Sequence, residues 1–334
     1  MSKSSRWLTL AALVIALGAP AAALPGSASG SEIRLGSNPV WTTPFLLIGK
    51  ERGAFDAPPA QVKWVTFVNP NQVMEAMAAS ELDAGAMTPA HYLIALDKGL
   101  KLTAVALLSG WNTPTSSYMV RVDSGIQTVQ DLRGKTVGVN NYGGVFDIYL
   151  RHMLDRNGMD PKKDVNFVAY PPDEAKKLLA EGKVDAYLGF PPDPQELRDK
   201  KIGHVVVNSA VDRPWSQYFC CFVTASKEFV RKHPVATKRA VRAILKATDL
   251  CAFEPDRAAR TLVAKGFTQR YDYALQTMKD VVYNKWRVYD PEDTLRFYAL
   301  RLHEAGMIKS TPQKLIAHGT DWRFLNELKK ELKG

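Results

Sequence analysis

The sequence predicts an α/β fold of two lobes, with a largely helical C-terminal segment packed on the first lobe. Three observations predict it: an internal repeat with a constant offset of 102 residues, an alternation of β-type runs and helical patterns inside each copy, and a helical pattern over most of residues 225–334. Strands that alternate with helices favour a parallel sheet with helices on both faces. Because this unit occurs twice, we expect two such lobes.

The N-terminal residues 1–31 are typical of a secretory signal peptide. Lys3 and Arg6 precede an apolar run at residues 7–17, and two stretches of small residues, 21–23 and 27–30, follow as candidate cleavage sites. The run is shorter than the about 20 apolar residues that a membrane span requires. We therefore expect an exported chain that resides in the periplasm, with an uncleaved membrane anchor as the alternative interpretation.

The composition argues against several functional classes. The formal net charge is +10, but the positive residues are spread along the chain without a basic tract or an aromatic RNA-binding signature, so we expect no nucleic-acid partner. Attraction of an anionic ligand is another use of such a charge. The three cysteines, Cys220, Cys221 and Cys251, are too few for a disulfide framework, and we expect buried thiols, with a disulfide between two of them left open.

The repeat relates residues 69–89 to residues 171–191. Both copies place a proline where a helix begins, which is favourable because proline lacks the N–H group that a first helical turn leaves unpaired. Both also place an aspartate before a short β-type run. The pairs related by the offset include Pro70 and Pro172, Ala78 and Ala180, Asp83 and Asp185, Pro89 and Pro191, Asn38 and Asn140, and Trp41 and Gly143.

Each copy follows the order β-α-β-α-β when its apolar periodicity is traced along the chain. In the first copy the expected strands are 33–36, 62–67 and 83–87, with helices at 43–52 and from 70 onward. In the second copy the strands are 135–139, 165–170 and 185–188, with helices at 145–157 and from 172 onward. Further strands are expected at 102–108 and 205–207, and the pair Arg156 and Gly158 predicts where the helix before them ends.

Two further β-rich segments, at residues 117–122 and 217–224, lie where the chain passes between the copies and returns. We interpret both as strands that cross between the lobes and act as the hinge. The expected domains are residues 1–31 as the signal peptide, 32–115 together with 221–334 as lobe 1, and 116–220 as lobe 2.

Parallel sheets of this kind bind ligands at the carboxyl ends of their strands, where the strand order switches. The loops at those ends are residues 37–43, 88–91, 140–145 and 190–193. Two lobes whose switch points face each other enclose a cleft. We therefore expect a protein that binds a small molecule between its lobes.

Six stretches, in their order and spacing, carry a resemblance to a known family: 43–55 (TPFLLIGKERGAF), 79–85 (ASELDAG), 129–138 (VQDLRGKTVG), 182–186 (GKVDA), 229–236 (FVRKHPVA) and 305–312 (AGMIKSTP). The chain resembles the periplasmic solute-binding proteins of ABC transporters in the nitrate, sulfonate and taurine group. That group is related to the NMT1/THI5-like family. The resemblance covers nearly the whole mature chain.

The resemblance implies a type II periplasmic-binding-protein-like fold, in which two Rossmann-like lobes joined by two crossing strands close on a ligand like a Venus flytrap. It implies the capture of a small anionic or neutral organic molecule, sulfonate-, nitrate- or pyrimidine-like, for import by an ABC transporter permease with its ATPase. It also implies a monomer that is not an enzyme and that needs no metal and no cofactor.

The family contacts its ligands through loops at the strand ends. The ligand-binding residues that the resemblance carries onto this chain are Trp41, Thr42 and Thr88 in the first lobe and Tyr142, Gly143, Gly144 and Phe190 in the second. Trp41 is expected to cover a flat or apolar part of the ligand. The two glycines let a ligand approach the backbone, and the N–H groups of Gly144 and Val145, at the start of a helix, favour an anion. Packing of Trp41 on its own lobe, a tight glycine turn and helix capping by Thr42, Thr43, Asn140 and Asn141 are the structural alternatives.

Two other functions stay open. The run Cys220-Cys221-Phe222 is loosely similar to the cysteine-rich motif of the yeast pyrimidine synthases, although this chain has fewer cysteines. Metal binding by Cys220, Cys221 and His91 would make the chain a metal-dependent enzyme of that type, whereas His91 otherwise caps a helix or lies on the surface. A receptor for a sensor protein is the third function. The sequence does not identify the ligand.

Overall fold

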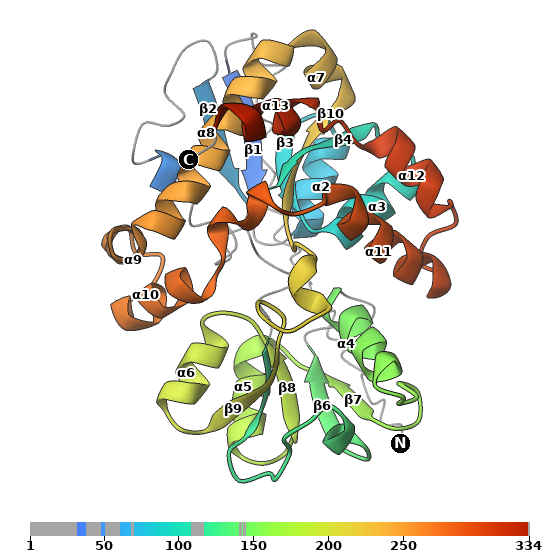
Figure 1. The fold of residues 1–334 in the computed structure, drawn as a ribbon, viewed down its shortest axis with the longest axis vertical. Helices are drawn as coiled ribbons and strands as arrows, with labels where there is room; N and C mark the ends of the chain where they lie inside the picture. The colour runs from blue at the N-terminus through green and yellow to red at the C-terminus, as the bar shows by residue number, and fades with distance from the viewer. Residues whose placement is uncertain are drawn as a thin grey trace, which may run out of the picture.

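The computed structural model describes residues 32–37, 48–50, 61–67, 70–107, 117–139, 142 and 145–332. Figure 1 shows two lobes, one above the other, with the chain passing between them near the middle of the molecule. Each lobe is built on one five-stranded sheet. The two-lobed α/β architecture predicted from the repeat is therefore confirmed.

The first sheet consists of β1 (Glu32–Ser37), β2 (Gln61–Thr66), β3 (Ala84–Met87), β4 (Leu102–Leu107) and β10 (Phe222–Ser226). Its strands lie in the order β2-β1-β3-β10-β4. β1 is parallel to β2 and to β3, whereas β10 is antiparallel to both of its neighbours. The parallel arrangement predicted for the β-α-β-α-β unit is confirmed by β1, β2 and β3, whereas β10, which returns from the other lobe, joins the sheet antiparallel.

The second sheet repeats this plan with β5 (Ser117–Arg121), β6 (Thr136–Val139), β7 (Asn166–Ala169), β8 (Ala186–Gly189) and β9 (Gly203–Asn208). Its order is β7-β6-β8-β5-β9, and β5 is antiparallel to β8 and β9. Each sheet thus holds one antiparallel strand, in the fourth position, that follows a crossing between the lobes.

The repeated aspartates explain why the two copies share their spacing. The Oδ2 atom of Asp83 accepts the backbone N–H of Arg34 at 2.9 Å, and Oδ2 of Asp185 accepts that of Thr136 at 2.8 Å. The backbone N–H of each aspartate donates in return to the same strand residue, at 3.0 and 2.9 Å. The offset of 102 residues relates both members of the two pairs. Each aspartate therefore fixes the entry of a third strand onto the first.

The helices of the two copies are α2 (Pro70–Ala78), α3 (Pro89–Asp97), α4 (Val145–Arg156), α5 (Pro172–Ala180) and α6 (Asp193–Asp199). α2 and α5 begin at prolines, as predicted, and α3 also begins at one. After α4, Gly158 has φ +71°, the left-handed conformation that glycine adopts most easily beyond a helix end. Of the helix predicted at 43–52, residues 48–50 are helical and the rest lies outside the described residues.

The prediction of a strand over residues 217–224 is wrong in its first half. Residues 215–217 form the 3₁₀ turn η2 (Trp215–Gln217), and the N–H of Tyr218 donates to the carbonyl of Trp215 at 3.1 Å. These local hydrogen bonds use backbone groups that a strand would need for its ladder. Regular pairing begins at Phe222, where β10 meets β3 and β4. A second short turn, η1 (Gln130–Leu132), precedes β6.

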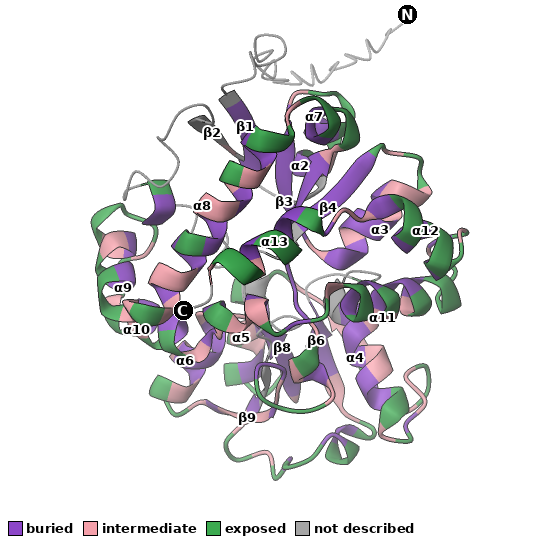
Figure 2. Cartoon of the chain, turned by 45° about the horizontal axis from the view of Figure 1, so that its top comes forward, coloured by how far each residue is buried: buried purple, intermediate pink, exposed green. Residues whose placement is uncertain are grey.

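The C-terminal segment packs on the first lobe, as predicted. It comprises α7 (Lys227–Lys232), α8 (Pro234–Phe253), α9 (Pro255–Ala264), α10 (Tyr271–Asp280), η3 (Tyr283–Arg287), α11 (Pro291–Glu304), α12 (Pro312–Gly319) and α13 (Arg323–Glu331). α8 and α13 contact β4, and α11 and α12 contact α3. Figure 2 shows buried residues along β3 and β4 and exposed residues on the outer sides of α11 and α13. Trp286 and Tyr298 of this segment belong to the first lobe's hydrophobic core.

Candidate functional site

The carboxyl edges of the two sheets point toward each other across the middle of the molecule (Figure 1). β4 runs parallel to β3, because both are antiparallel to β10, so the first crossing leaves from the carboxyl edge of the first sheet. It arrives at the carboxyl edge of the second sheet, because β5 is antiparallel to β8. The second crossing joins the end of β9 to the start of β10 at the same two edges. Loops at these edges are where sheets of this type bind ligands.

Thr88 follows β3 directly and lies at the predicted edge. It is the N-cap of α3, and its Oγ1 accepts the backbone N–H of His91 at 3.4 Å. The same hydroxyl lies 2.7 Å from Nδ1 of His91. Burial lowers the pKa of His91, so the ring is neutral at neutral pH. Thr88 is therefore held in a capping pair with His91, which agrees with the capping alternative for His91.

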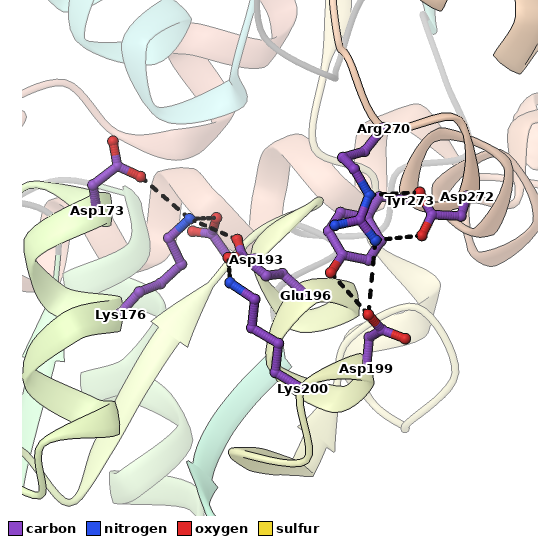
Figure 3. Close-up of polar contacts among 9 residues, drawn as sticks. All are labelled: Asp173, Lys176, Asp193, Glu196, Asp199, Lys200, Arg270, Asp272 and Tyr273. Atoms are coloured by element: carbon purple, nitrogen blue, oxygen red, sulfur yellow. Dashed lines mark hydrogen bonds and ion pairs between the residues drawn. The ribbon is translucent and has the colours of Figure 1, made fainter.

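Phe190 follows β8 at the equivalent place in the second lobe, and its carbonyl accepts the N–H of Asp193 at 3.0 Å. The carboxylate of Asp193 is almost fully buried, with Nζ of Lys176 at 3.0 Å (Figure 3). The Tyr187 hydroxyl lies 3.1 Å from Oδ2 of the same carboxylate. Burial raises the pKa of Asp193, and Lys176 opposes that shift. This cluster was not predicted from the sequence, although the repeat offset relates Asp193 to His91.

The loop before α4 is described at Tyr142, which is 58% exposed. Its hydroxyl donates to the carbonyl of Phe167 at 2.9 Å, so the phenol oxygen is bound within its own lobe. Val145 is the first residue of α4, as expected. Asp147 is buried in the first turn of this helix and pairs with Arg151 at 2.8 Å. This acid near the predicted anion site was not anticipated.

Four of the predicted ligand-binding residues, Trp41, Thr42, Gly143 and Gly144, lie outside the described residues. The four that are described, Thr88, Tyr142, Val145 and Phe190, all lie beyond strand ends at the two facing edges. The structure thus places the described members of the predicted set at the expected edges. Their contact with a ligand remains a prediction.

The three cysteines are free and buried. Cys220 and Cys221 lie just before β10, with the Cys221 thiol donating to Sγ of Cys220 at 3.4 Å. This hydrogen bond and burial raise the pKa of Cys221, and burial raises that of Cys251. Such thiols stay protonated at neutral pH, whereas metal binding and nucleophilic attack use the thiolate. Within the described residues, no group of three or more His, Cys, Asp or Glu side chains is arranged to hold a metal ion.

An aromatic cluster joins the second crossing to both lobes, and sequence analysis gave no sign of it. Tyr218 of the crossing stacks on Phe297 of α11, with ring centroids 4.1 Å apart. His152 of α4 packs edge-on against Trp215 and Phe297. Nη1 of Arg301 lies 3.2 Å from Nδ1 of His152. Burial, and then the charge of Arg301, lower the pKa of His152 to about 4.

None of the helices in the described part of the chain combines the length and the apolar character needed to span a membrane.

Comparison with known proteins identifies the family of this chain and solved structures with the same fold. The NMT1-like family matches residues 26–267 of this chain. The chain is 27% identical over 260 residues to the 4-amino-5-hydroxymethyl-2-methylpyrimidine phosphate synthase THI13 of Saccharomyces cerevisiae, covering 73% of this chain and 72% of the relative.

Two solved structures illustrate the shared fold. The periplasmic aliphatic sulphonate binding protein SsuA from Escherichia coli aligns with a TM-score of 0.72 and 17% identity, over 85% of this chain and 95% of that chain. The periplasmic nitrate-binding protein NrtA from Synechocystis PCC 6803 aligns with a TM-score of 0.72 and 14% identity, over 91% of this chain and 89% of that chain. These alignments confirm the predicted periplasmic-binding-protein fold.

Proposed function

Because the chain belongs to the NMT1-like family, we propose that it is an exported solute-binding protein that captures a small anionic or neutral organic molecule between its lobes. The observation that carries the proposal is the topology of the two crossings. Both join carboxyl edges, so loops from both sheets converge on one space. A catalytic cysteine in that space would need an accessible thiolate, whereas Cys220 and Cys221 are buried and the pKa of Cys221 is raised by its hydrogen bond to Cys220 and by burial.

The proposed ligand class follows from the similar structures. One is a sulphonate-binding and another a nitrate-binding protein. The net charge of +10 also favours an anion. The proposed contacts are Trp41, Thr42 and Thr88 from the first lobe and Tyr142, Gly143, Gly144, Val145 and Phe190 from the second.

The proposed lobes are residues 32–115 with 221–334, and residues 116–220. Core packing supports a boundary near the end of the second crossing. Trp215 packs in the core of the second sheet, whereas Phe219 and Cys220 pack in that of the first. Phe297 contacts both cores.

We further propose that the chain acts as a monomer in the periplasm and delivers its ligand to a permease with its ATPase. The family and the fold support this partnership. Residues 1–31, the predicted signal peptide, lie outside the described residues.

A metal-dependent pyrimidine synthase is the second candidate, and its support is the 27% identity to the yeast enzyme. The two candidates differ in their need for thiolates. Replacing Cys220 and Cys221 together with alanine should leave ligand affinity within about tenfold if the chain is a binding protein. Loss of stoichiometric iron or zinc on that change would instead favour the enzyme.

A thermal-shift screen tests the proposed function. The purified mature chain would be heated with alkanesulfonates, taurine, nitrate and 4-amino-5-hydroxymethyl-2-methylpyrimidine, and mass spectrometry would identify any co-purifying molecule. A true ligand at a hundredfold excess over its dissociation constant stabilises the folded chain by about 2.7 kcal/mol. A chain that retains no small molecule, responds to none of these compounds and turns over a pyrimidine precursor would contradict the proposal.

A further inference from the structure

Helix α6 of the second lobe lies against helix α10 of the C-terminal segment. α6 is anchored to its own lobe through β9 and β5. α10 is anchored to α8 and α9, and α8 contacts β4 of the first sheet. Contacts between α6 and α10, which we call the α6–α10 junction, therefore connect the two lobes away from the chain crossings.

One carboxylate of α10 receives two donors from α6. Oδ2 of Asp280 accepts the side-chain amide of Gln195 at 2.9 Å and Nη2 of Arg198 at 3.0 Å. The Arg198 and Asp280 side chains are each 36% exposed, so salt in the solvent reaches this pair.

A second carboxylate bridges the lobes in the opposite direction. Oδ2 of Asp199, at the end of α6, accepts the hydroxyl of Tyr273 at 3.0 Å, and Nη2 of Arg270 lies 3.8 Å away (Figure 3). The Arg270 guanidinium also stacks over the Tyr273 ring at 3.9 Å and pairs with Asp272. Each lobe thus supplies a carboxylate to donors on the other.

The junction also contains one unfavourable group. Gln195 is 2% exposed, and its Oε1 has no hydrogen-bond partner in the described structure. A buried carbonyl without a partner is unfavourable, and separation of the two helices would return it to water. Favourable ion pairs beside an unsatisfied carbonyl make a contact that can form and break reversibly.

The junction lies next to the candidate site. α6 begins three residues after Phe190, and Gln195 is in its first turn. A contact at Gln195 therefore fixes the position of the loop at residues 190–193 relative to the first lobe.

We propose that Asp280 is a positioning residue: by holding Gln195 and Arg198 across the lobes, it stabilises the closed arrangement in which the two carboxyl edges approach each other. This inference rests on the proposed function, because closure of the lobes has a role only in a protein that encloses a solute between them. It concerns the lobe arrangement and not a contact with the solute.

The test measures the distance between the lobes without added solute. Spin labels would be attached to cysteines introduced at the exposed positions Lys163 in the second lobe and Lys314 in the first, and pulsed electron paramagnetic resonance would give the distance distribution. Asp280→Ala should reduce the closed fraction by about threefold, as expected for a partly exposed charge pair. Asp256→Ala is the matched control, because Asp256 pairs with Arg260 inside the same segment at 2.9 Å.

A distance distribution of Asp280→Ala equal to that of the unsubstituted protein would overturn the proposal, as would an equal change in Asp256→Ala. If Asp280→Ala does not fold, Arg198→Ala decides, with the same expected loss of the closed fraction. Where both fold, the double variant should lose little more than either single variant, and fully additive losses would contradict a direct pair. Because no solute is added, these outcomes do not depend on whether the chain binds the proposed class of ligand.

Discussion

Asp83 and Asp185 occupy the same place in the two copies, yet the residues around them differ. Asp83 also binds the guanidinium of Arg34, with Nη2 at 3.0 Å, and both side chains are nearly buried. The counterpart of Arg34 in the second copy is Thr136, so Asp185 meets a backbone N–H without a buried cation. The repeat predicted that these residues correspond, but among the described residues the ion pair is found in the first copy alone.

Replacing Asp83 with alanine should therefore destabilise the protein more than replacing Asp185. Asp83→Ala removes the carboxylate that neutralises the buried Arg34 guanidinium, a change that costs roughly 3–5 kcal/mol. Asp185→Ala removes the acceptor of one backbone N–H, that of Thr136, at about 1–3 kcal/mol. Urea unfolding of both variants gives the two losses. Equal losses, or a larger one for Asp185→Ala, would show that the buried ion pair does not distinguish the copies.

At the candidate site, the location of residues at strand ends was easier to predict from the sequence than their hydrogen-bond partners. Thr88 and Phe190 were assigned to strand ends because the alternation of strands and helices locates those ends. The partners of their neighbours, such as the Phe167 carbonyl for Tyr142, depend on side-chain orientations that one sequence does not encode in its spacing. The Asp193 cluster was missed for the same reason.

Trp41 and Gly144 carry the sharpest prediction about the site. Trp41→Ala should weaken binding of the compound identified by the thermal screen and reduce the ligand-induced change in tryptophan fluorescence. Gly144→Val should weaken binding more than stability, because a branched side chain blocks the approach to the helix N–H groups. Lys163→Ala, at an exposed position of the second lobe outside the candidate loops, is the control, and its affinity should stay within about tenfold. Unchanged affinity in both site variants, each folded, would mean that the ligand binds elsewhere.

Among the elements, those with clear periodicity were predicted nearly to the residue. The helix expected at 145–157 is α4, which ends at Arg156, and the strand expected at 62–67 is β2. The strand predicted at 217–224 is too long, because the β-prone residues at its start follow a 3₁₀ turn and the strand begins only at Phe222. The antiparallel direction of β5 and β10 follows from the chain's route between lobes, which local pattern does not reveal.

The contact between α4 and α11 should make stability depend on pH. His152 titrates at about 6.5 in the unfolded chain, whereas its pKa in the folded protein is lowered to about 4. Between these values the unfolded state binds more protons, so the free energy of unfolding falls as the pH is lowered through that window. The contribution of His152 to the change in unfolding free energy stays below about 1.4 kcal/mol per pH unit, which is the limit for the uptake of one proton.

Urea unfolding between pH 6.5 and pH 4 measures this slope. His152→Gln, which keeps a polar side chain but does not titrate in this range, should remove His152's contribution to it. A slope that is unchanged in the variant would mean that protonation of His152 is not what weakens the folded state.

For the whole molecule, the repeat was sufficient to predict two lobes, because two similar α/β units each need their own sheet. Contacts between the lobes were beyond prediction, since they join residues far apart in the chain. Gln195 and Asp280 are separated by 85 positions, and His152 and Arg301 by 149. No periodicity or motif relates such pairs, and only the folded arrangement brings them together.

Ligand-induced closure is the prediction that belongs to the whole molecule. Two lobes joined by two crossings at their facing edges can move about those crossings, and a ligand that contacts both edges stabilises the closed arrangement more than the open one. The compound identified by the thermal screen should therefore reduce the radius of gyration in small-angle X-ray scattering and raise the melting temperature together. The junction at Asp280 sharpens this expectation: Asp280→Ala, which favours the open arrangement before the ligand is added, should show a larger decrease in radius on binding than the unsubstituted protein. A ligand that raises the melting temperature without changing the radius in either protein would show that binding does not draw the lobes together.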